Sequence, residues 1–204
     1  MEVKLKWITP DAEIEILEIA RTSFPITKSP RQLLKYLIDN KHFAPLEMAS
    51  MCIDIKTSKA ISHQIYHNDI QVFQELSQSL TFEPVNITNN NLLKTSKDNV
   101  PYHVSDLIKD HVNRSRIVYD TLIKEGVAQE QASMLLPECT QIHMYMSGTL
   151  RAWLSMLNVK LNDNQKEVVD ISLEIVKIMK QELPLISHST NYFNNNKGLF
   201  IDLS

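Results

Sequence analysis

Apolar side chains recur at helical spacing in the first part of the chain. Residues 9–24 open with the letters TPD, which predict an N-cap and a helix start. The apolar stripe of this helix is expected to consist of Ile14, Leu17, Ile19 and Ala20. Residues 29–41 repeat the signature, with Ser29 as the cap and Pro30 in the first turn. The pattern predicts two amphipathic helices in succession.

The second half of the chain is also mostly helical in its pattern. Its predicted helices cover residues 102–126, 128–137, 149–160 and 162–184. Gly126 is expected to cap the first of them, and Pro184 ends the last. Several methionines lie within residues 134–156, where we interpret them as core filler.

Two segments have the pattern of strands. Residues 47–58 carry no helix cap and contain the alternating letters CIDI, so they predict a strand. Residues 79–88 are a second candidate, which Pro84 places at an edge or a bulge. Asparagine-rich residues 86–101 predict a polar surface loop, and the C-terminal tail, about 185–204, a strand-like arm or disorder. The class that follows is α+β, with several helices and a small sheet.

Composition narrows the class of protein. At 204 residues the chain suits one domain, 1–204, and its 43% hydrophobic content is ordinary for a globular protein. A net charge of -3 argues against a dedicated nucleic-acid binder, and no apolar run is long enough to span a membrane. Cys52 and Cys139 read as buried free thiols in a reducing compartment. With no signal peptide recognised, we expect a cytoplasmic protein.

Local motifs support little chemistry by themselves. The three glycines of the chain exclude glycine-rich phosphate loops. His63 and His67 have the spacing of zinc ligands on a helix, but the HExxH glutamate and a third ligand are missing, so no metal is expected. A hydrolase triad has weak support, because no GxSxG elbow occurs. The polar segment 59–80 is the remaining candidate site.

Four collinear segments carry a resemblance to a known family. They are "ARTSF" (20–24), "SPRQLLKYLIDNKHFAPLEM" (29–48), "ISHQIYHNDIQVFQELSQSL" (61–80) and the stretch from "EGVAQEQAS" through "SGTLR" to "QKE" (125–167). In this order and spacing they resemble the flavin-dependent, or alternative, thymidylate synthases. The third segment lies where that family has Arg-His-Arg followed by Asn/Gln-Glu-x-Ser-x-Arg-Tyr.

The resemblance implies a fold, an assembly and a reaction. The fold is a small mixed sheet flanked by helices, in a homotetramer whose sites lie between subunits. FAD and dUMP would bind there, C5 of dUMP would be reductively methylated, methylenetetrahydrofolate would supply the carbon, and NADPH would reduce the flavin. By resemblance the nucleotide-binding set is Gln64, Gln74, Glu75, Ser77, Ser79, Ser133 and Lys160. The cofactor-binding set is Ser23, His67, Asn68, Asp69, Arg151 and Ser155.

The charged positions of the family pattern are the ones that differ. His67-Asn68-Asp69 stands in place of Arg-His-Arg, Ser79 and Ser133 replace two further arginines, and Lys160 replaces a late arginine. Each charge-assisted bond to phosphate is worth about 1.5–3 kcal/mol, so losing about four arginines would cost roughly 6 kcal/mol or more. This predicts that the chain alone lacks ordinary dUMP methylation.

Three functions remain open at this point. The first is a non-catalytic or partner subunit in pyrimidine nucleotide metabolism, in a homotetramer or in a hetero-oligomer with an intact paralogue. The second is an active, rebuilt flavin-dependent enzyme acting on C5 of dUMP or a related pyrimidine nucleotide. The third is reuse of the fold for another ligand. The Asn-, Lys- and Ile-rich composition indicates an AT-rich genome, such as that of a phage or a low-GC bacterium.

Overall fold

The computed structural model describes residues 1–23, 29–66, 72–75 and 102–189. These residues form two compact units that alternate along the chain. The first unit contains the described parts of residues 1–55, 65–74 and 145–204, and the second those of 56–64 and 75–144. Each unit is described by itself below. The single domain expected over the whole chain stays a prediction.

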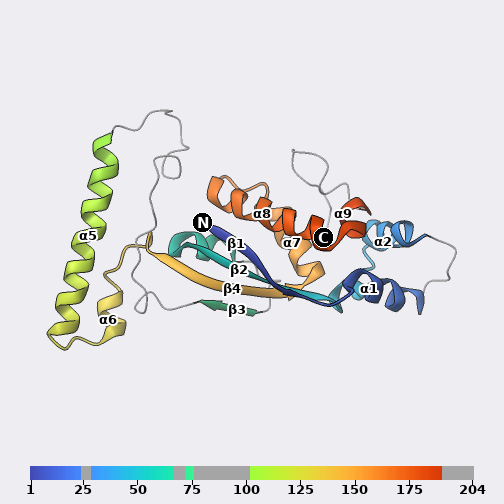
Figure 1. The fold of residues 1–204 in the computed structure, drawn as a ribbon, viewed down its shortest axis with the longest axis horizontal. Coiled ribbons are helices and arrows are strands. Elements are labelled where there is room, and N and C mark those ends of the chain that lie inside the picture. Colours follow the sequence, from blue (N-terminus) through green and yellow to red (C-terminus); the bar gives the residue numbers. More distant parts are fainter. Residues whose placement is uncertain (24–28, 67–71, 76–101, 190–204) are drawn as a thin grey trace. The chain divides into compact units, whose positions relative to one another are not determined.

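Each strand of the described residues is followed by one or more helices. In chain order they are β1 (Glu2–Ile8), α1 (Ala12–Arg21), α2 (Pro30–Asp39), α3 (Ala44–Glu47), β2 (Ser50–Ser58), α4 (Lys59–Ile65), β3 (Val72–Glu75), α5 (Tyr102–Lys124), α6 (Gln129–Ser133), β4 (Gln141–Thr149), α7 (Leu150–Lys160), α8 (Lys166–Glu182) and α9 (Pro184–Ser189) (Figure 1). The expected α+β class is confirmed.

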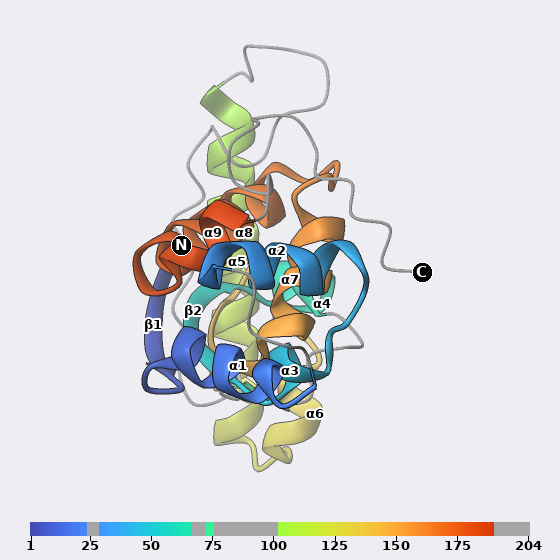
Figure 2. The same cartoon turned by 90° about the vertical axis from the view of Figure 1, so that its right-hand side faces the viewer.

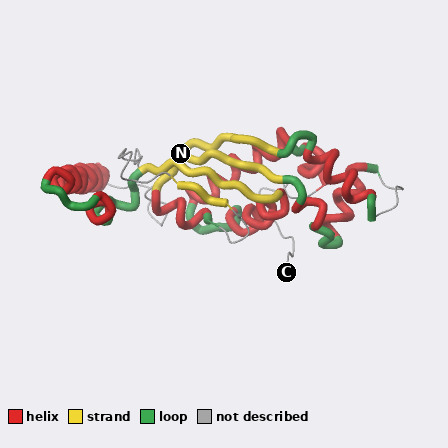
Figure 3. The backbone as a smooth tube through the Cα atoms, turned by 90° about the horizontal axis from the view of Figure 1, so that it is seen from below, coloured by secondary structure: helices red, strands yellow, loops and turns green. Residues whose placement is uncertain are grey.

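A four-stranded sheet has the order β1-β2-β4-β3 (Figure 3). Strands β2 and β4 run antiparallel, because the Leu150 N–H donates to the Ala49 carbonyl at 2.8 Å while the Lys59 N–H donates to the Thr140 carbonyl at 3.0 Å. Burial alternates strictly along β4, as expected for a strand with one face on the core. Both β2 and β4 are interior strands, and β2 has more buried residues than β4.

The core of the first unit lies between the sheet and α7. Trp153 of α7 is fully buried, and its indole N–H donates to the carbonyl of Met51 at 3.0 Å. Helix α8 packs against β1. Of the methionines of residues 134–156, Met146 and Met156 are core residues of this unit, and Met144 is buried in the second unit. At Met134 this interpretation is wrong, because its side chain is 81% exposed.

The starts of the first two helices follow local sequence rules to different degrees. Ser29 caps α2 in a complete capping box with Gln32, as expected. The cap of α1 is Asp11, which has a left-handed backbone (φ 49) and makes no side-chain cap bond. The Thr9 hydroxyl instead donates to the Ser50 carbonyl and joins the start of the helix to β2. The expected apolar stripe is wrong at Ile14, which is 54% exposed.

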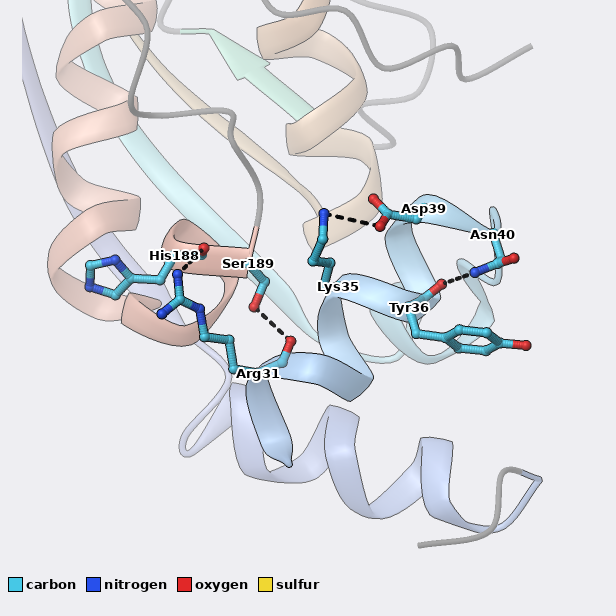
Figure 4. Close-up of polar contacts among 7 residues, drawn as sticks. All are labelled: Arg31, Lys35, Tyr36, Asp39, Asn40, His188 and Ser189. Atoms are coloured by element: carbon cyan, nitrogen blue, oxygen red, sulfur yellow. Dashed lines mark hydrogen bonds and ion pairs between the residues drawn. The ribbon is translucent and has the colours of Figure 1, made fainter. Parts of the chain in front are cut away.

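Helix α9 packs on α2 (Figure 2). The Arg31 guanidinium donates to the His188 carbonyl at 3.0 Å, and the Ser189 hydroxyl donates to the Arg31 carbonyl at 3.1 Å (Figure 4). The buried Glu13 carboxylate accepts from the Ile186 N–H at 2.7 Å. The tail predicted over about 185–204 is therefore wrong for its described part, because residues Pro184–Ser189 are a packed helix.

Helices α5 and α6 lie side by side in the second unit (Figure 1). Tyr119, Ala132 and Leu136 form their small apolar core. Gly126 follows α5 with φ +84, the left-handed conformation that favours glycine after a helix, so its predicted capping role is confirmed. Among the described residues, Leu107 and Ile117 of α5 are each 64% exposed.

Sequence patterns missed three of the strands. The alternating residues of β1 and β4 were not assigned, and β3 is only four residues long. The predicted strand at 47–58 is confirmed over Ser50–Ser58 as β2, and it is wrong at Glu47, which ends helix α3. The candidate strand 79–88 and the polar loop 86–101 lie outside the described residues.

Candidate functional site

Glu75, at the end of β3, has both carboxylate oxygens in contact with α4. The Lys59 ammonium lies 2.6 Å from Oε1, and the Ser62 hydroxyl lies 3.3 Å from Oε2. The Glu75 side chain is 12% exposed and that of Lys59 29%, so the ion pair is largely withdrawn from water. All three residues belong to the second unit. We call Lys59, Ser62 and Glu75 the Glu75 cluster.

The segment before β4 anchors the first turn of α4, which carries Lys59 and Ser62 of the cluster. This helix begins directly after β2, and the backbone N–H groups of Lys59 and Ala60 donate to the Thr140 and Glu138 carbonyls, each at 3.0 Å. The Ser58 hydroxyl accepts from the Ile61 N–H at 3.4 Å. Because positions i and i+3 share a helix face, Lys59 and Ser62 are presented together. The cluster therefore stands on anchored backbone.

The two contacts of Glu75 differ in strength. Lys59 makes a charge-assisted bond, which is about twice as strong as a neutral one. The Ser62 hydroxyl has a single proton, which it shares between Glu75 and the nearer Lys59 carbonyl at 2.8 Å. An ionised carboxylate has about four acceptor sites, so Glu75 keeps capacity to accept from a ligand. The cluster orients this carboxylate and leaves it able to accept further bonds.

Arg151 forms a second charged site, in the first unit. Its guanidinium, at the start of α7, pairs with the Glu47 carboxylate of α3 and lies 5.1 Å from the centre of the Phe43 ring. Each of the paired side chains is 45% exposed. Helices α3 and α7 pack together, so the pair links them. We call Phe43, Glu47 and Arg151 the Arg151 cluster.

The predicted nucleotide-binding residues are divided between the two units. Gln64, Glu75 and Ser133 belong to the second unit, whereas Gln74 and Lys160 belong to the first. Gln64 and Gln74 are exposed, and Lys160 is half-buried. The Ser133 hydroxyl donates to the Glu130 carbonyl of its own helix at 2.8 Å. Ser77 and Ser79 lie outside the described residues.

The described members of the predicted cofactor set all lie in the first unit. Ser155 follows Arg151 by one turn of α7 and is half-buried. Ser23, just after α1, is exposed. The other three, His67, Asn68 and Asp69, lie outside the described residues. The site roles of both sets stay predictions.

Other reactive side chains of the described chain suggest no second site. Cys52 is buried and Cys139 half-buried, and neither is in a disulfide. Burial raises the pKa of both thiols, which disfavours the nucleophilic thiolate. Over residues 1–23, 29–66, 72–75 and 102–189, no three side chains of His, Cys, Asp or Glu could share a metal ion. A surface hollow beside α5 is lined by residues such as Tyr119, Ile123 and Val127, none of them from the predicted sets.

Comparison with known proteins covers almost the whole described chain. The family model described as thymidylate synthase complementing protein matches residues 4–185. The chain belongs to this family. A probable flavin-dependent thymidylate synthase of Paramecium bursaria Chlorella virus 1 is 29% identical over 198 residues, which cover 89% of this chain and 91% of the relative. A flavin-dependent thymidylate synthase of Synechocystis sp. is 27% identical over 185 residues, or 82% and 84% of the two chains.

Membership of the thymidylate synthase complementing protein family confirms the resemblance seen in the sequence. The matched range contains every described element from α1 to α8 in full, and therefore both charged clusters. None of the described helices has the length and apolar character needed to cross a membrane. Glu75 and Arg151 were recognised from family motifs, but their partners were not.

Sequence reasoning missed Lys59, Ser62, Glu47 and Phe43 as members of these clusters. Lys59 lies 16 positions before Glu75, and Glu47 lies 104 positions before Arg151. The helical spacing of Lys59 and Ser62 was readable, but it does not reveal which carboxylate they face. That information lies in the pairing of strands, which brings residues distant in the chain together.

Proposed function

We propose that this chain is a pyrimidine-nucleotide-binding subunit that does not carry out ordinary dUMP methylation by itself. It would act in a homotetramer, or in a hetero-oligomer with a paralogue that retains Arg-His-Arg. In such an assembly it contributes the nucleotide-facing part of a shared site. A cytoplasmic location belongs to the same proposal.

The observation that carries the proposal is that Glu75 is sheltered from water and paired with a cation. This carboxylate is one of the retained motif residues, it is 12% exposed, and it has a cation at 2.6 Å. An unpaired charge at such a position would be costly, and replacement by a neutral residue would remove the cost. The chain instead keeps the carboxylate together with a partner for it. This supports a working nucleotide contact.

The cofactor side of the site supports the absence of independent catalysis. A flavin dinucleotide carries a diphosphate, which needs cations or backbone donors. Positions 67–69 read His-Asn-Asp, and the positive charge of Arg151 is balanced by Glu47. Within the described part of the predicted cofactor set, no other cation is present. These residues do not fit the diphosphate of FAD.

Exposed apolar side chains on the second unit support self-association. Leu107 and Ile117 of α5 are each 64% exposed, and Met134 beside α6 is 81% exposed. Contiguous apolar surface that remains in water is typical of sites that other chains cover, and we propose that these side chains belong to such a surface. A Leu107→Lys, Ile117→Lys variant should therefore give a smaller assembly in size-exclusion chromatography with light scattering. An unchanged mass would argue against this surface.

Binding and complementation assays test the function itself. We expect calorimetry to detect dUMP binding, absorption spectra to show no FAD uptake up to millimolar concentration, and the chain alone to give no dTMP. Mixing with a subunit that carries Arg-His-Arg should yield a hetero-oligomer that methylates dUMP. Absence of dUMP binding would overturn the proposal. A yellow protein that produces dTMP unaided would replace it with the alternative below.

The alternative is an active, rebuilt flavin-dependent enzyme that modifies C5 of dUMP or a related pyrimidine nucleotide. The relatives favour it, since both reported above are named as flavin-dependent thymidylate synthases, the viral one as probable, and match over most of the chain. Methylenetetrahydrofolate and NADPH would then be its co-substrates. The two proposals differ in whether purified protein holds flavin.

A further inference from the structure

Lys59 is a cation that the family motifs do not account for. The motif segment that carries the resemblance begins at Ile61, after Lys59, and contains Glu75. The family pattern has arginines at positions 67, 69 and 79 around this glutamate, whereas the chain has His67, Asp69 and Ser79. A partly buried carboxylate needs a nearby source of positive charge. In the described structure Lys59 supplies it.

The geometry of the Lys59–Glu75 contact suits orientation of the carboxylate. Lys59 lies in the first turn of α4, whose backbone is hydrogen-bonded to the segment before β4, and Glu75 ends a strand of the same sheet. The ammonium meets Oε1 at 2.6 Å, and Ser62 meets the other oxygen at 3.3 Å. Contacts at both oxygens restrict rotation of the carboxylate plane. The remaining lone pairs have a fixed direction.

We propose that Lys59, assisted by Ser62, is a positioning residue that holds Glu75 as an oriented acceptor for a donor group of a bound pyrimidine nucleotide. The inference rests on the proposed function. An ionised carboxylate only accepts hydrogen bonds, so the recognised group must be a donor. On a uracil nucleotide the donors are the ring imide N–H and the sugar hydroxyl. Lys59 acts through Glu75 and does not itself contact the nucleotide.

The test measures dUMP affinity by calorimetry in the full-length chain and its variants. Glu75→Gln removes the charged acceptor and Lys59→Met releases that acceptor from its fixed direction, so each variant should weaken dUMP binding at least about tenfold. Lys59→Arg keeps a cation and should stay within about threefold of the unmodified chain. The double variant should bind no more weakly than Glu75→Gln alone, because the two residues act on one contact.

Controls separate positioning from general structural damage. Lys109→Met makes the same chemical change on an exposed part of α5 in the same unit, and should leave dUMP affinity unchanged. Circular dichroism checks that each variant is folded. If Lys59→Met does not fold, Lys59→Gln, which keeps a hydrogen-bond donor without the charge, takes its place with an expected loss of about three- to tenfold.

Nucleotide analogues identify the donor. With dCMP the ring imide N–H is absent, and with 2′,3′-dideoxy-UMP the sugar hydroxyl is absent. If Glu75 binds the sugar hydroxyl, the dideoxy analogue should bind the unmodified chain and Glu75→Gln equally weakly. If Glu75 binds the imide, dCMP, whose ring nitrogen only accepts, should bind the unmodified chain weakly and Glu75→Gln, whose amide can donate, no more weakly. Glu75→Gln should still weaken the other analogue at least about tenfold. Weakening of both analogues by Glu75→Gln would contradict recognition of a single donor.

The outcomes distinguish this inference from the proposed function. If Glu75→Gln weakens dUMP binding and Lys59→Met does not, the positioning role of Lys59 is wrong while nucleotide binding stands. If neither variant changes the affinity of a chain that binds dUMP, the inference is equally overturned. If the unmodified chain binds no dUMP, the proposed function fails and the inference fails with it.

Discussion

The Glu75 cluster and the Arg151 cluster each place a retained family residue in an ion pair, but in different surroundings. Glu75 and Lys59 are 12% and 29% exposed, whereas Arg151 and Glu47 are each 45% exposed. Ion pairs in water contribute little because solvent and salt screen them, while partly buried charges depend on their partners. The comparison indicates that retention of a charged residue in the sequence does not show how much it contributes to stability. That contribution depends on how far the charge is buried.

Removal of Lys59 should have the largest effect on stability. Lys59→Met leaves the Glu75 carboxylate without its cation, and we expect the free energy of unfolding to fall by about 2 kcal/mol. The 29% exposure of Lys59 keeps this below the loss for a fully buried pair. Urea denaturation followed by circular dichroism measures the change. A loss no greater than that of Glu47→Gln would remove the distinction between the clusters.

Ser62→Ala should sharpen the comparison from within the buried cluster. Ser62 is fully buried, and its hydroxyl serves both the Lys59 carbonyl and Glu75. Removal of this donor should lower the free energy of unfolding by about 1 kcal/mol. Ser115→Ala is the control, because the exposed Ser115 hydroxyl donates to a carbonyl of its own helix. Urea denaturation of the two variants is compared. Equal losses in the two variants would show that burial does not decide the effect.

Glu13 adds a buried carboxylate with a different set of partners. Burial raises its pKa, although the N–H groups of Ile186 and Leu185 lower it in part. The folded chain therefore holds this proton to higher pH than the unfolded chain does. Stability from this group is fully present below pH 4.5 and is lost as pH rises through the raised pKa.

Glu13→Gln should remove this pH dependence. Relative to the variant, the unmodified chain should lose stability between pH 4.5 and neutrality, by about 1 kcal/mol at most. Thermal unfolding of both proteins over that range measures the difference. Glu15→Gln, in the same helix and exposed, is the matched control. Parallel stability curves for unmodified and Glu13→Gln protein would contradict the expectation.

Glu47→Gln should have the smallest effect and the greatest sensitivity to salt. Loss of an exposed pair costs about 0.5 kcal/mol, and this cost should largely disappear in molar salt. The Lys59–Glu75 coupling, measured by a double-mutant cycle, should persist under the same conditions. Denaturation series at low and high salt compare the two. If salt weakened the Lys59–Glu75 coupling as well, both clusters would behave as solvent-exposed ion pairs, contrary to the expectation.

Local signals predicted the helices better than the strands. The Ser29 capping box and the turn at Gly126 are decided within a few residues, so both were readable. Strand β4 was missed because its alternating methionines have meaning only when one face lies on a core. The Thr9 hydroxyl could not be assigned either, because its partner carbonyl is 41 positions away.

The sequence by itself determined the family, the α+β class and the identity of the retained and replaced motif residues, because collinear motifs and helix caps are local properties of the chain. Only the tertiary structure decided that Glu75 is paired with Lys59 and sheltered, while Arg151 is paired with Glu47 and exposed. Partner and burial depend on how helices α3, α4 and α7 and strand β3 pack, and residue spacing carries no record of that packing.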